Sequence, residues 1–158
     1  MSSDFQPNFL QRAIALAIEN VRAGGGPFGA VIVQNGEIIS EGANRVTTES
    51  DPTAHAEIVA IRAACRKLEN FQLTGCDLYA SAEPCPMCLG AIYWARLDRV
   101  FYGASAADAA AAEFDDAFIF REFAKPPRQR RIPMEQHLRE EALAAFQAWR
   151  ANPNRTPY

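Results

Sequence analysis

The sequence has little that would connect it to a membrane or to nucleic acid. No apolar run approaches the length of a membrane-spanning helix, and the stretch from Met1 to Pro7 has no apolar segment typical of a secretion signal. The net charge is −3 and the sequence pI is near 5.4. Such a balance gives no electrostatic attraction to phosphate backbones or anionic membranes. We therefore expect a cytoplasmic protein that binds no nucleic acid and no membrane.

Cysteine and histidine are both scarce. Four cysteines among 158 residues are too few for a disulfide scaffold, and the only histidines are His55 and His137. In a reducing compartment a Cys-x-x-Cys pair such as Cys85 and Cys88 is more often metal-binding or redox-active than a structural disulfide. The pair alone leaves three interpretations open, which are a metal site, a redox disulfide and a place in the core.

What the sequence does have is typical of an ordinary globular domain. Its 158 residues are 49% hydrophobic and 22% charged, and they contain no internal repeat. This length suits one domain with a sizeable core. We expect a single domain over residues 1–158.

The order of predicted elements indicates an α/β fold. Two β-rich runs, residues 28–33 and 37–41, are separated by Asn35-Gly36, which is a hairpin signature because both turn residues need positive φ. Asp51, Pro52 and Thr53 are typical of a helix start. Further strands are expected at residues 78–81 and 99–102, with a helix at residues 86–96 and an alanine-rich helix at residues 104–112. Alternating strands and helices favour parallel pairing, and the hairpin adds an antiparallel pair, so the sheet should be mixed.

His55, Cys85 and Cys88 supply the ligands of a zinc site. Zinc prefers nitrogen and sulfur, and a catalytic site uses three protein ligands and leaves the fourth position to water. A structural site would need a fourth Cys or His. His137 belongs to the exposed-looking side of the last predicted helix. The remaining cysteines, Cys65 and Cys76, fit a core better than a metal site.

Spacing decides how these residues can meet. His55 and Glu57 are two apart and would point to nearly opposite sides of a regular helix, so both can face one cavity only from a first turn. Pro86 suits the first position of the helix that carries Cys85 and Cys88. We therefore expect two helix N-termini to converge on the ion at the carboxyl edge of the sheet, where open α/β sheets bind ligands.

His55-Ala56-Glu57 and Pro84-Cys85-Pro86-Met87-Cys88 match the H-x-E…P-C-x-x-C signature of zinc deaminases. Together with Gly25-Gly26-Pro27-Phe28-Gly29-Ala30, they make the chain resemble the cytidine deaminase superfamily. From about Phe9 to Tyr158 it is similar to the small bacterial guanine deaminases. Downstream segments extend this likeness, namely Ala91-Ile92-Tyr93-Trp94-Ala95-Arg96, Phe114-Asp115-Asp116 and Phe146-Gln147-Ala148-Trp149-Arg150.

The resemblance implies a fold and a reaction. The fold would be a three-layer α/β/α arrangement around a central mixed five-stranded sheet. One zinc ion per subunit, held by His55, Cys85 and Cys88, would lower the pKa of its water from 15.7 toward about 7. The resulting hydroxide would attack C2 of guanine and yield xanthine and ammonia, with Glu57 as the proton shuttle.

The resemblance also implies a set of substrate contacts. Asp116 would anchor guanine, which suits an acceptor-only carboxylate facing N–H donors. Asn44 would hydrogen-bond the purine, and aromatic rings would enclose it. Taken singly, the aromatic residues fit a core and Asp116 fits a helix cap. The full set is Phe28, Asn44, Ala56 through its backbone, Trp94, Phe114, Asp116 and Tyr158.

In the resembled enzymes the C-terminal segment crosses to a second subunit. We accordingly expect a homodimer in which residues 125–133 form an extended connector and residues 134–158 are exchanged. Tyr158 would complete the partner's site. Three arginines of the connector, Arg128, Arg130 and Arg131, are an alternative nucleic-acid patch, which the acidic balance of the chain disfavours.

Three rival functions share part of the pattern. A tRNA adenosine deaminase would need a basic surface for an anticodon loop. A cytosine deaminase is disfavoured by Phe114-Asp115-Asp116 and by the tail that ends at Tyr158. A structural zinc module would need a fourth protein ligand and would leave Glu57 without a role.

Overall fold

The computed structural model describes residues 5–158, which form two compact units. One unit ends at Ala117 and the other spans Phe118–Tyr158. Residues 1–4, which open the N-terminal stretch considered above, lie outside the described residues. Within the described part, no helix is both long enough and apolar enough to cross a membrane.

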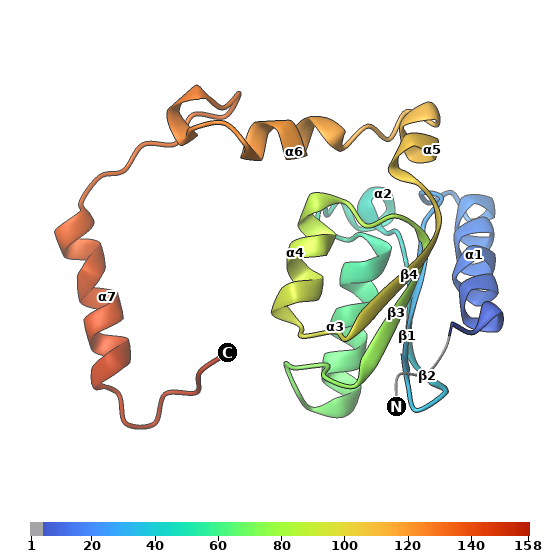
Figure 1. Ribbon diagram of the computed structural model, residues 1–158, viewed down its shortest axis with the longest axis horizontal. Coiled ribbons are helices and arrows are strands. Elements are labelled where there is room, and N and C mark those ends of the chain that lie inside the picture. Colours follow the sequence, from blue (N-terminus) through green and yellow to red (C-terminus); the bar gives the residue numbers. More distant parts are fainter. Residues whose placement is uncertain (1–4) are drawn as a thin grey trace. The chain divides into compact units, whose positions relative to one another are not determined.

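The first unit contains a mixed sheet between two layers of helices (Figure 1). The strand order is β2-β1-β3-β4, in which β1 is antiparallel to both neighbours and β3 is parallel to β4. Helix α1 covers one face, and α3 and α4 cover the other. The predicted three-layer α/β/α class is confirmed. The elements are α1 (Pro7–Arg22), β1 (Gly29–Gln34), β2 (Glu37–Ala43), α2 (Val46–Glu49), α3 (Ala56–Leu68), β3 (Cys76–Ala82), α4 (Pro86–Trp94), β4 (Arg99–Ala104) and α5 (Ala106–Ala111).

The β1–β2 hairpin forms where the sequence predicts it. Asn35 and Gly36 have φ of 52° and 79°, and Gln34 pairs with Glu37 across the turn. Positive φ at both central residues gives a two-residue turn whose twist matches that of the strands.

Strand β1 is buried on both faces, so its alternate residues belong to different cores. Ala30 and Ile32 lie in the cluster beneath α3 and α4. Val31 and Val33 lie with Phe9 in the cluster beneath α1. An apolar run without alternation is what a strand between two helical layers requires.

Two glycines let the helices lie directly on the strands. A Cβ on Gly29 would be 2.2 Å from the Ala13 carbonyl oxygen of α1. A Cβ on Gly42 would be 2.2 Å from the Ala56 carbonyl oxygen of α3. Neither approach leaves room for a side chain, so these positions set the spacing between the layers.

The prediction of a five-stranded sheet is wrong, because the sheet of the described residues has four strands. The apolar residues after Phe114 add no strand, because Ala117–Phe123 form helix α6. Its first N–H, that of Ala117, donates to Asp115 Oδ1 at 3.0 Å, which favours a helix start. A short apolar run does not distinguish a strand from a helix by periodicity alone.

The predicted start of α3 is also displaced. Asp51 Oδ1 accepts from the backbone N–H of Thr53 at 2.8 Å and from its hydroxyl at 2.7 Å. These bonds make a local turn, and α3 begins at Ala56 with His55 as its N-cap. Asp and Thr are common in turns as well as at helix caps. These residue types therefore predict a start of α3 earlier than the observed one at Ala56.

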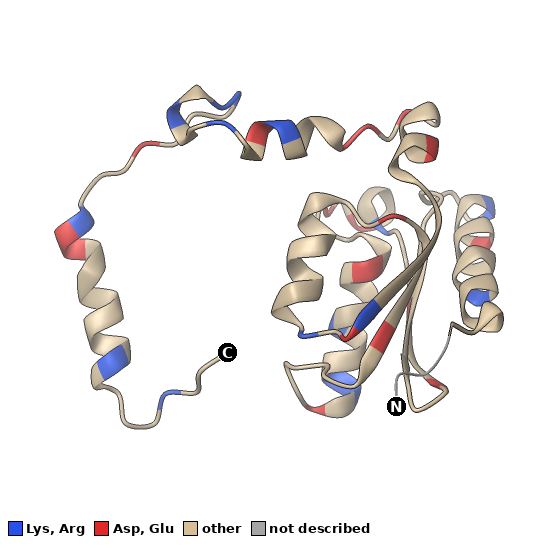
Figure 2. Ribbon diagram, in the orientation of Figure 1, with Lys and Arg blue, Asp and Glu red and all other residues tan. Residues whose placement is uncertain are grey.

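The second unit consists of short elements without a core. It contains most of α6, the 3-10 turn η1 (Pro127–Gln129) and α7 (Arg139–Ala151), and none of these has a buried residue. Residues 125–133 are otherwise irregular, as expected of a connector. Arg130 donates within the segment, to the Phe123 and Lys125 carbonyls at 3.3 and 3.2 Å. Figure 2 shows acidic and basic residues interspersed along both units.

Candidate metal centre and active site

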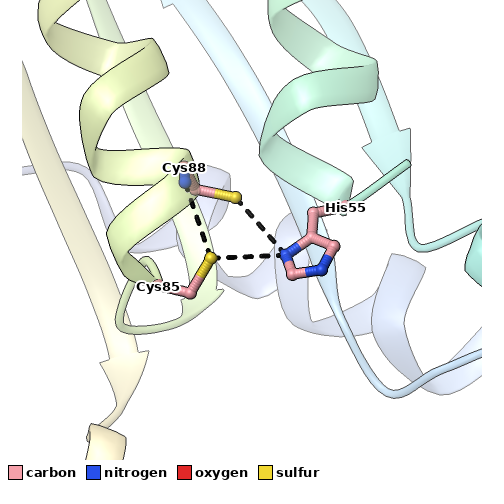
Figure 3. Close-up of side chains that lie close together, drawn as sticks. All are labelled: His55, Cys85 and Cys88. Carbon is pink, nitrogen blue, oxygen red and sulfur yellow. Dashed lines mark hydrogen bonds between the residues drawn. The ribbon is translucent and has the colours of Figure 1, made fainter. Parts of the chain in front are cut away.

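Three side chains from two helices converge in the first unit (Figure 3). His55 Nδ1 lies 3.4 Å from Cys85 Sγ and 3.5 Å from Cys88 Sγ. The three ligand atoms all lie within 4.8 Å of one another, and Cys88 is buried. This convergence confirms that the Cys-x-x-Cys pair joins His55 and does not form a disulfide.

Helix starts hold the ligands in place. Cys85 is the N-cap of α4, Pro86 follows in its first turn, and the Cys88 N–H donates to Cys85 Sγ at 3.5 Å. His55 is the N-cap of α3. Strands β2 and β3 are both antiparallel to β1, so they run in the same direction. The chain passes from the carboxyl end of β2 to α3 and from the carboxyl end of β3 to α4. The predicted meeting of two helix N-termini at this edge is confirmed.

Contacts within the cluster separate the acidities of the two thiols. The Cys88 thiol, as hydrogen-bond donor, lowers the pKa of Cys85 to about 4. The same contact, together with burial, raises the pKa of Cys88. The hydrogen bond with Cys85 raises the pKa of His55. A bound dication favours deprotonated thiols and a neutral imidazole, so Cys88 and any protonated His55 would release protons on binding it, whereas Cys85 is already a thiolate near neutral pH.

The donor set fits zinc. Two sulfurs and one imidazole nitrogen are soft and borderline ligands of the kind that Zn²⁺ prefers. Two thiolates balance the charge of the ion, which suits a largely buried position. Among the described residues no fourth Cys, His, Asp or Glu joins this group. A three-ligand set leaves one coordination position for water, as catalytic zinc sites do.

Glu57 lies in the first turn of α3, next to the ligand cluster. Its side chain is buried, with 8% of the residue exposed. Burial raises its pKa, and the charge of Cys85 acts in the same direction. His55 and Glu57 thus both lie at the start of α3, His55 as its N-cap and Glu57 in its first turn.

Several predicted substrate contacts lie around the same helix starts. The rings of Phe28 and Phe114 meet edge to face, with centroids 5.0 Å apart. Asn44 is buried, and the chain just after it is tied to the α3 start by a 2.9 Å hydrogen bond from the Arg45 N–H to the Ala54 carbonyl.

Ala56 and Asp116 complete this group. Ala56 is the first residue of α3, directly after the ligand His55. Asp116 has its pKa raised by burial and then by the charge of Cys85, and its own charge acts on His55. Asp116 is therefore in electrostatic contact with the ligand cluster.

Trp94 lies at the other end of α4 from the ligand cluster, and Tyr158 belongs to the second unit. Trp94 is the last residue of α4, so at a rise of 1.5 Å per residue it is about 14 Å along the helix from Cys85. Its side chain is 64% exposed. Tyr158 belongs to the second unit, where its ring lies 6.4 Å from that of Trp149.

Glu83 has a role that the sequence did not reveal. Its Oε2 accepts from the Ala106 N–H at the start of α5 at 2.9 Å, and its own N–H donates to the Ala104 carbonyl at 2.8 Å. Glu83 thereby joins the segment that carries the cysteines to α5. No local pattern could have indicated this, because the residues joined are 23 apart in sequence.

Comparison with known proteins agrees with this site. Residues 3–104 match the family model described as the cytidine and deoxycytidylate deaminase zinc-binding region. The chain belongs to this deaminase family. The matched segment contains all three ligands and Glu57, and it ends before Phe114 and Asp116.

Individual members of this deaminase family differ in how much of the chain they match. The guanine deaminase of Bacillus subtilis (strain 168) is 60% identical over 151 residues, which cover 95% of this chain and 97% of that protein. The X-ray structure of guanine deaminase from Bacillus subtilis has a TM-score of 0.95 at 58% identity, covering 98% of this chain and 99% of that one. The tRNA-specific adenosine deaminase of Aquifex aeolicus (strain VF5) is 46% identical over 96 residues, covering 61% of this chain and 64% of that protein. The likeness to guanine deaminase thus extends over the segment beyond the shared zinc region.

Proposed function

We propose that the protein hydrolyses guanine to xanthine and ammonia with the help of one zinc ion. The observation that carries this proposal is the 60% identity to a guanine deaminase over all but a few residues of the chain. The aligned stretch covers 95% of the chain and so continues past residue 104, where the matched zinc region ends. Asp116 interacts electrostatically with His55 and Cys85, which supports a place for it beside the base.

A zinc ion held by this cluster would supply the activated water. His55, Cys85 and Cys88 would hold zinc through one nitrogen and two sulfurs, and bound zinc lowers the pKa of a water molecule toward neutrality. The chain supplies everything else, which is proton transfer, orientation of the base and exclusion of solvent.

Glu57 moves the proton. Its carboxylate takes a proton from the attacking water, gives it to a ring nitrogen of the purine and then transfers a proton to the departing amine. A C2–O bond forms, the C2–N bond breaks and the amine leaves as ammonia. The raised pKa of this buried carboxyl suits a group that must both accept and release a proton near neutral pH.

The base is oriented by groups that differ in hydrogen-bonding capacity. An ionised Asp116 accepts only, so it pairs with the N–H groups of guanine, and Asn44 pairs with another edge. The Ala56 N–H is available because the first N–H groups of a helix have no intrahelical acceptor. The Phe28 and Phe114 rings would enclose the purine. A base that left one of these buried polar groups unpaired would lose about 1–3 kcal/mol.

A panel of bases tests the proposal. The protein is incubated in turn with guanine, adenine, cytosine and an adenosine-containing anticodon stem-loop, and released ammonia is measured together with zinc per chain. We expect ammonia from guanine. Turnover of adenosine in the stem-loop would instead favour a tRNA adenosine deaminase. Turnover of cytosine would favour a cytosine deaminase. Tightly held zinc without turnover of any base would favour a structural zinc module.

We also propose a homodimer that exchanges residues 134–158. Helix α7 carries apolar side chains that remain exposed, with Phe146 64% and Trp149 41% exposed, and its N-cap Leu138 is 71% exposed. A helix with such a stripe is stable when the stripe is covered by another surface. Residues 125–133 would connect the zinc deaminase domain to this exchanged segment. Tyr158 would then complete the site of the partner, and an exposed Trp94 would face the interface.

Complementation between two inactive proteins tests the exchange. One protein carries Glu57→Gln and the other lacks residues 151–158. We expect each to be inactive alone and the mixture, after unfolding and refolding together, to regain activity, because an intact Glu57 site then receives an intact tail. A fully active truncated protein would contradict the exchange, and so would a mixture that forms mixed dimers without activity.

We also propose a cytoplasmic location, which the chemistry of the ligands supports. All four cysteines are free, and the two ligand cysteines must stay reduced to bind the ion. A reducing compartment maintains that state.

A further inference from the structure

Asn20, near the end of α1, joins two loops that lead into the active site. Its Nδ2 donates to the Gly26 carbonyl at 2.7 Å and to the Asn44 carbonyl at 2.8 Å. Gly26 lies before β1, and Asn44 follows β2. One half-buried amide group therefore uses both of its protons to hold the two ends of the hairpin together.

The glycines that follow α1 leave space for the Asn20 side-chain amide. A Cβ on Gly25 would lie 2.4 Å from Asn20 Nδ2, and its three nearest atoms all belong to the Asn20 side chain. A Cβ on Gly26 would lie 3.0 Å from Asn44 Oδ1. The absence of side chains at both positions thus makes room for two amide groups.

The contacts of Asn20 continue to two proposed base contacts. The Phe28 N–H donates to the Gly26 carbonyl at 2.9 Å, and the Asn44 N–H donates to the Phe28 carbonyl at 3.1 Å. Asn44 Oδ1 accepts from the Val46 N–H at 3.2 Å, which fixes the orientation of its side-chain amide. Phe28 and Asn44 are thus linked to each other and, through Gly26, to Asn20.

We propose that Asn20 is a positioning residue of the active site, which sets the places of Phe28 and Asn44 around the base without touching it. The inference rests on the proposed function, in which these two residues contact guanine. A shift of a contact group by a fraction of an ångström weakens the hold on the base before it affects the metal site. The role predicts a defect in substrate affinity with the zinc site intact.

Two substitutions remove the amide in different ways. Asn20→Ala deletes it, and Asn20→Asp replaces the donor by an acceptor that faces two carbonyl oxygens. We expect either variant to raise KM for guanine about tenfold, which is the loss of about 1.4 kcal/mol of hydrogen bonding, while kcat changes less. Zinc per chain stays at the wild-type value. Glu19→Ala, at the exposed neighbouring position of the same helix, is the matched control and keeps the wild-type KM.

Gly25→Ala supplies an independent variant, because its Cβ would displace the Asn20 side chain. Gly25→Ala alone should raise KM as Asn20→Ala does, and the double variant should be no worse than Asn20→Ala, since the colliding atoms are already gone. Additive effects in the double variant, or a wild-type KM in folded Asn20 variants, would overturn the inference. If Asn20→Ala does not fold, Gly25→Ala carries the test.

Hydrogen exchange gives a readout that needs no turnover. The Phe28 and Asn44 amides should exchange faster in Asn20→Ala than in wild type, while amides in the centre of α3 remain protected. Unchanged exchange at both amides would refute the positioning role. A wild-type protein that releases no ammonia from guanine would instead refute the proposed function, and the exchange experiment would still decide whether Asn20 orders these loops.

Discussion

Three carboxylates near the ligand cluster have different surroundings and therefore different uses. Glu57 is buried beside the ligands, and burial raises its pKa. Asp116 is partly buried, and its pKa is also raised. Glu83 is exposed and accepts a backbone N–H of α5. The first suits proton transfer, the second recognition and the third support of the backbone.

Glu57→Gln separates proton transfer from metal binding. Glutamine has nearly the same shape but cannot take a proton from water, so we expect ammonia release from guanine to fall by about 10²–10⁴-fold. Zinc per chain, measured by metal analysis, should not change because His55, Cys85 and Cys88 are intact. Cys88→Ser is the contrasting variant, in which zinc and activity fall together. A Glu57→Gln protein with near-wild-type turnover would show that another group moves the proton.

Asp116→Asn tests recognition. The amide presents donors where guanine also presents donors, so we expect kcat/KM for guanine to fall about 5- to 150-fold through the loss of about 1–3 kcal/mol. Asp115→Asn, at the adjacent exposed position, is the matched control. Equal losses in the two variants would assign the effect to the net charge of the loop and not to a contact with the base.

Helix starts and turns are the elements that bring the site together. The contact from Glu83 to the Ala106 N–H fixes the start of α5, and Ser105 and Asp108 form a capping box on the same turn. The Ala106 and Asp108 N–H groups in the first turn of this short helix thus donate to side chains that precede it, those of Glu83 and Ser105. The chain continues from α5 to Phe114 and Asp116, so fixing the start of α5 also helps to fix these two proposed base contacts.

Glu83→Ala should loosen that anchorage. We expect a loss of about 1 kcal/mol of unfolding free energy, typical of a removed cap, and a rise in KM for guanine that exceeds the change in kcat. Glu83→Gln retains an oxygen acceptor and should behave much like wild type in both measurements. An alanine variant with unchanged denaturant midpoint and unchanged KM would contradict this role.

The ion pair between α1 and β2 gives a pH dependence. Arg12 Nε and Nη2 each lie 2.8 Å from an oxygen of Glu41, and this hydrogen bonding lowers the pKa of Glu41. A carboxylate with a lowered pKa stabilises the folded state above its ordinary pKa of about 4.3, and the contribution disappears as pH falls through the lowered value.

Arg12→Ala should therefore destabilise the protein near neutral pH but not in acid. Both side chains are more than a third exposed, so we expect a loss of about 0.5 kcal/mol at about pH 7 that vanishes at about pH 3. Urea titrations at both pH values measure it, with Arg22→Ala on the same helix as control. A loss of the same size at both pH values would point to packing of the arginine stem and not to charge.

The sequence predicted an element correctly where residues close together in the chain determine its conformation. Asn35-Gly36 specified the hairpin because the turn needs two positive φ angles. Cys85, Pro86 and Cys88 specified their own helix start. The start of α3 was misplaced because Asp51 and Thr53 bond to each other and not to the helix. Residues 114–120 were ambiguous because a short apolar run suits a strand and a helix equally.

The site was predictable where chemistry limits the choice of residue. Few residue types bind zinc, so His55, Cys85 and Cys88 stood out by type and spacing. Asn20 did not, because an asparagine near the end of a helix has many uses and its Asn44 contact spans 24 residues of sequence. The position of Trp94 at the far end of α4 likewise depends on helix geometry that a motif does not express.

At the scale of the whole molecule, the two units differ in how far they bury their apolar side chains. The first unit buries a core on each face of its sheet. The helices of the second unit bury nothing, although α7 carries an apolar stripe. Association is the ordinary way to cover such a surface in water.

Phe146→Asp should weaken that association. A charge in an apolar contact costs several kcal/mol when it is not paired, so we expect the variant to shift from dimer toward monomer and to lose activity on dilution. Sedimentation over a range of concentrations measures the shift, and Gln147→Asp on the neighbouring face of α7 is the control. A wild-type protein that is monomeric at all concentrations would contradict the dimer itself.

The close approach of helices at Gly29 and Gly42 limits how this protein can evolve. At both positions the helix backbone lies on the strand, so the frame around the site cannot widen without breaking its core. New substrates of larger size must be accommodated by the loops alone. Variants selected from a random library for a bulkier base should therefore carry their changes in the loops before β1, after β2 or after α5, and should keep both glycines.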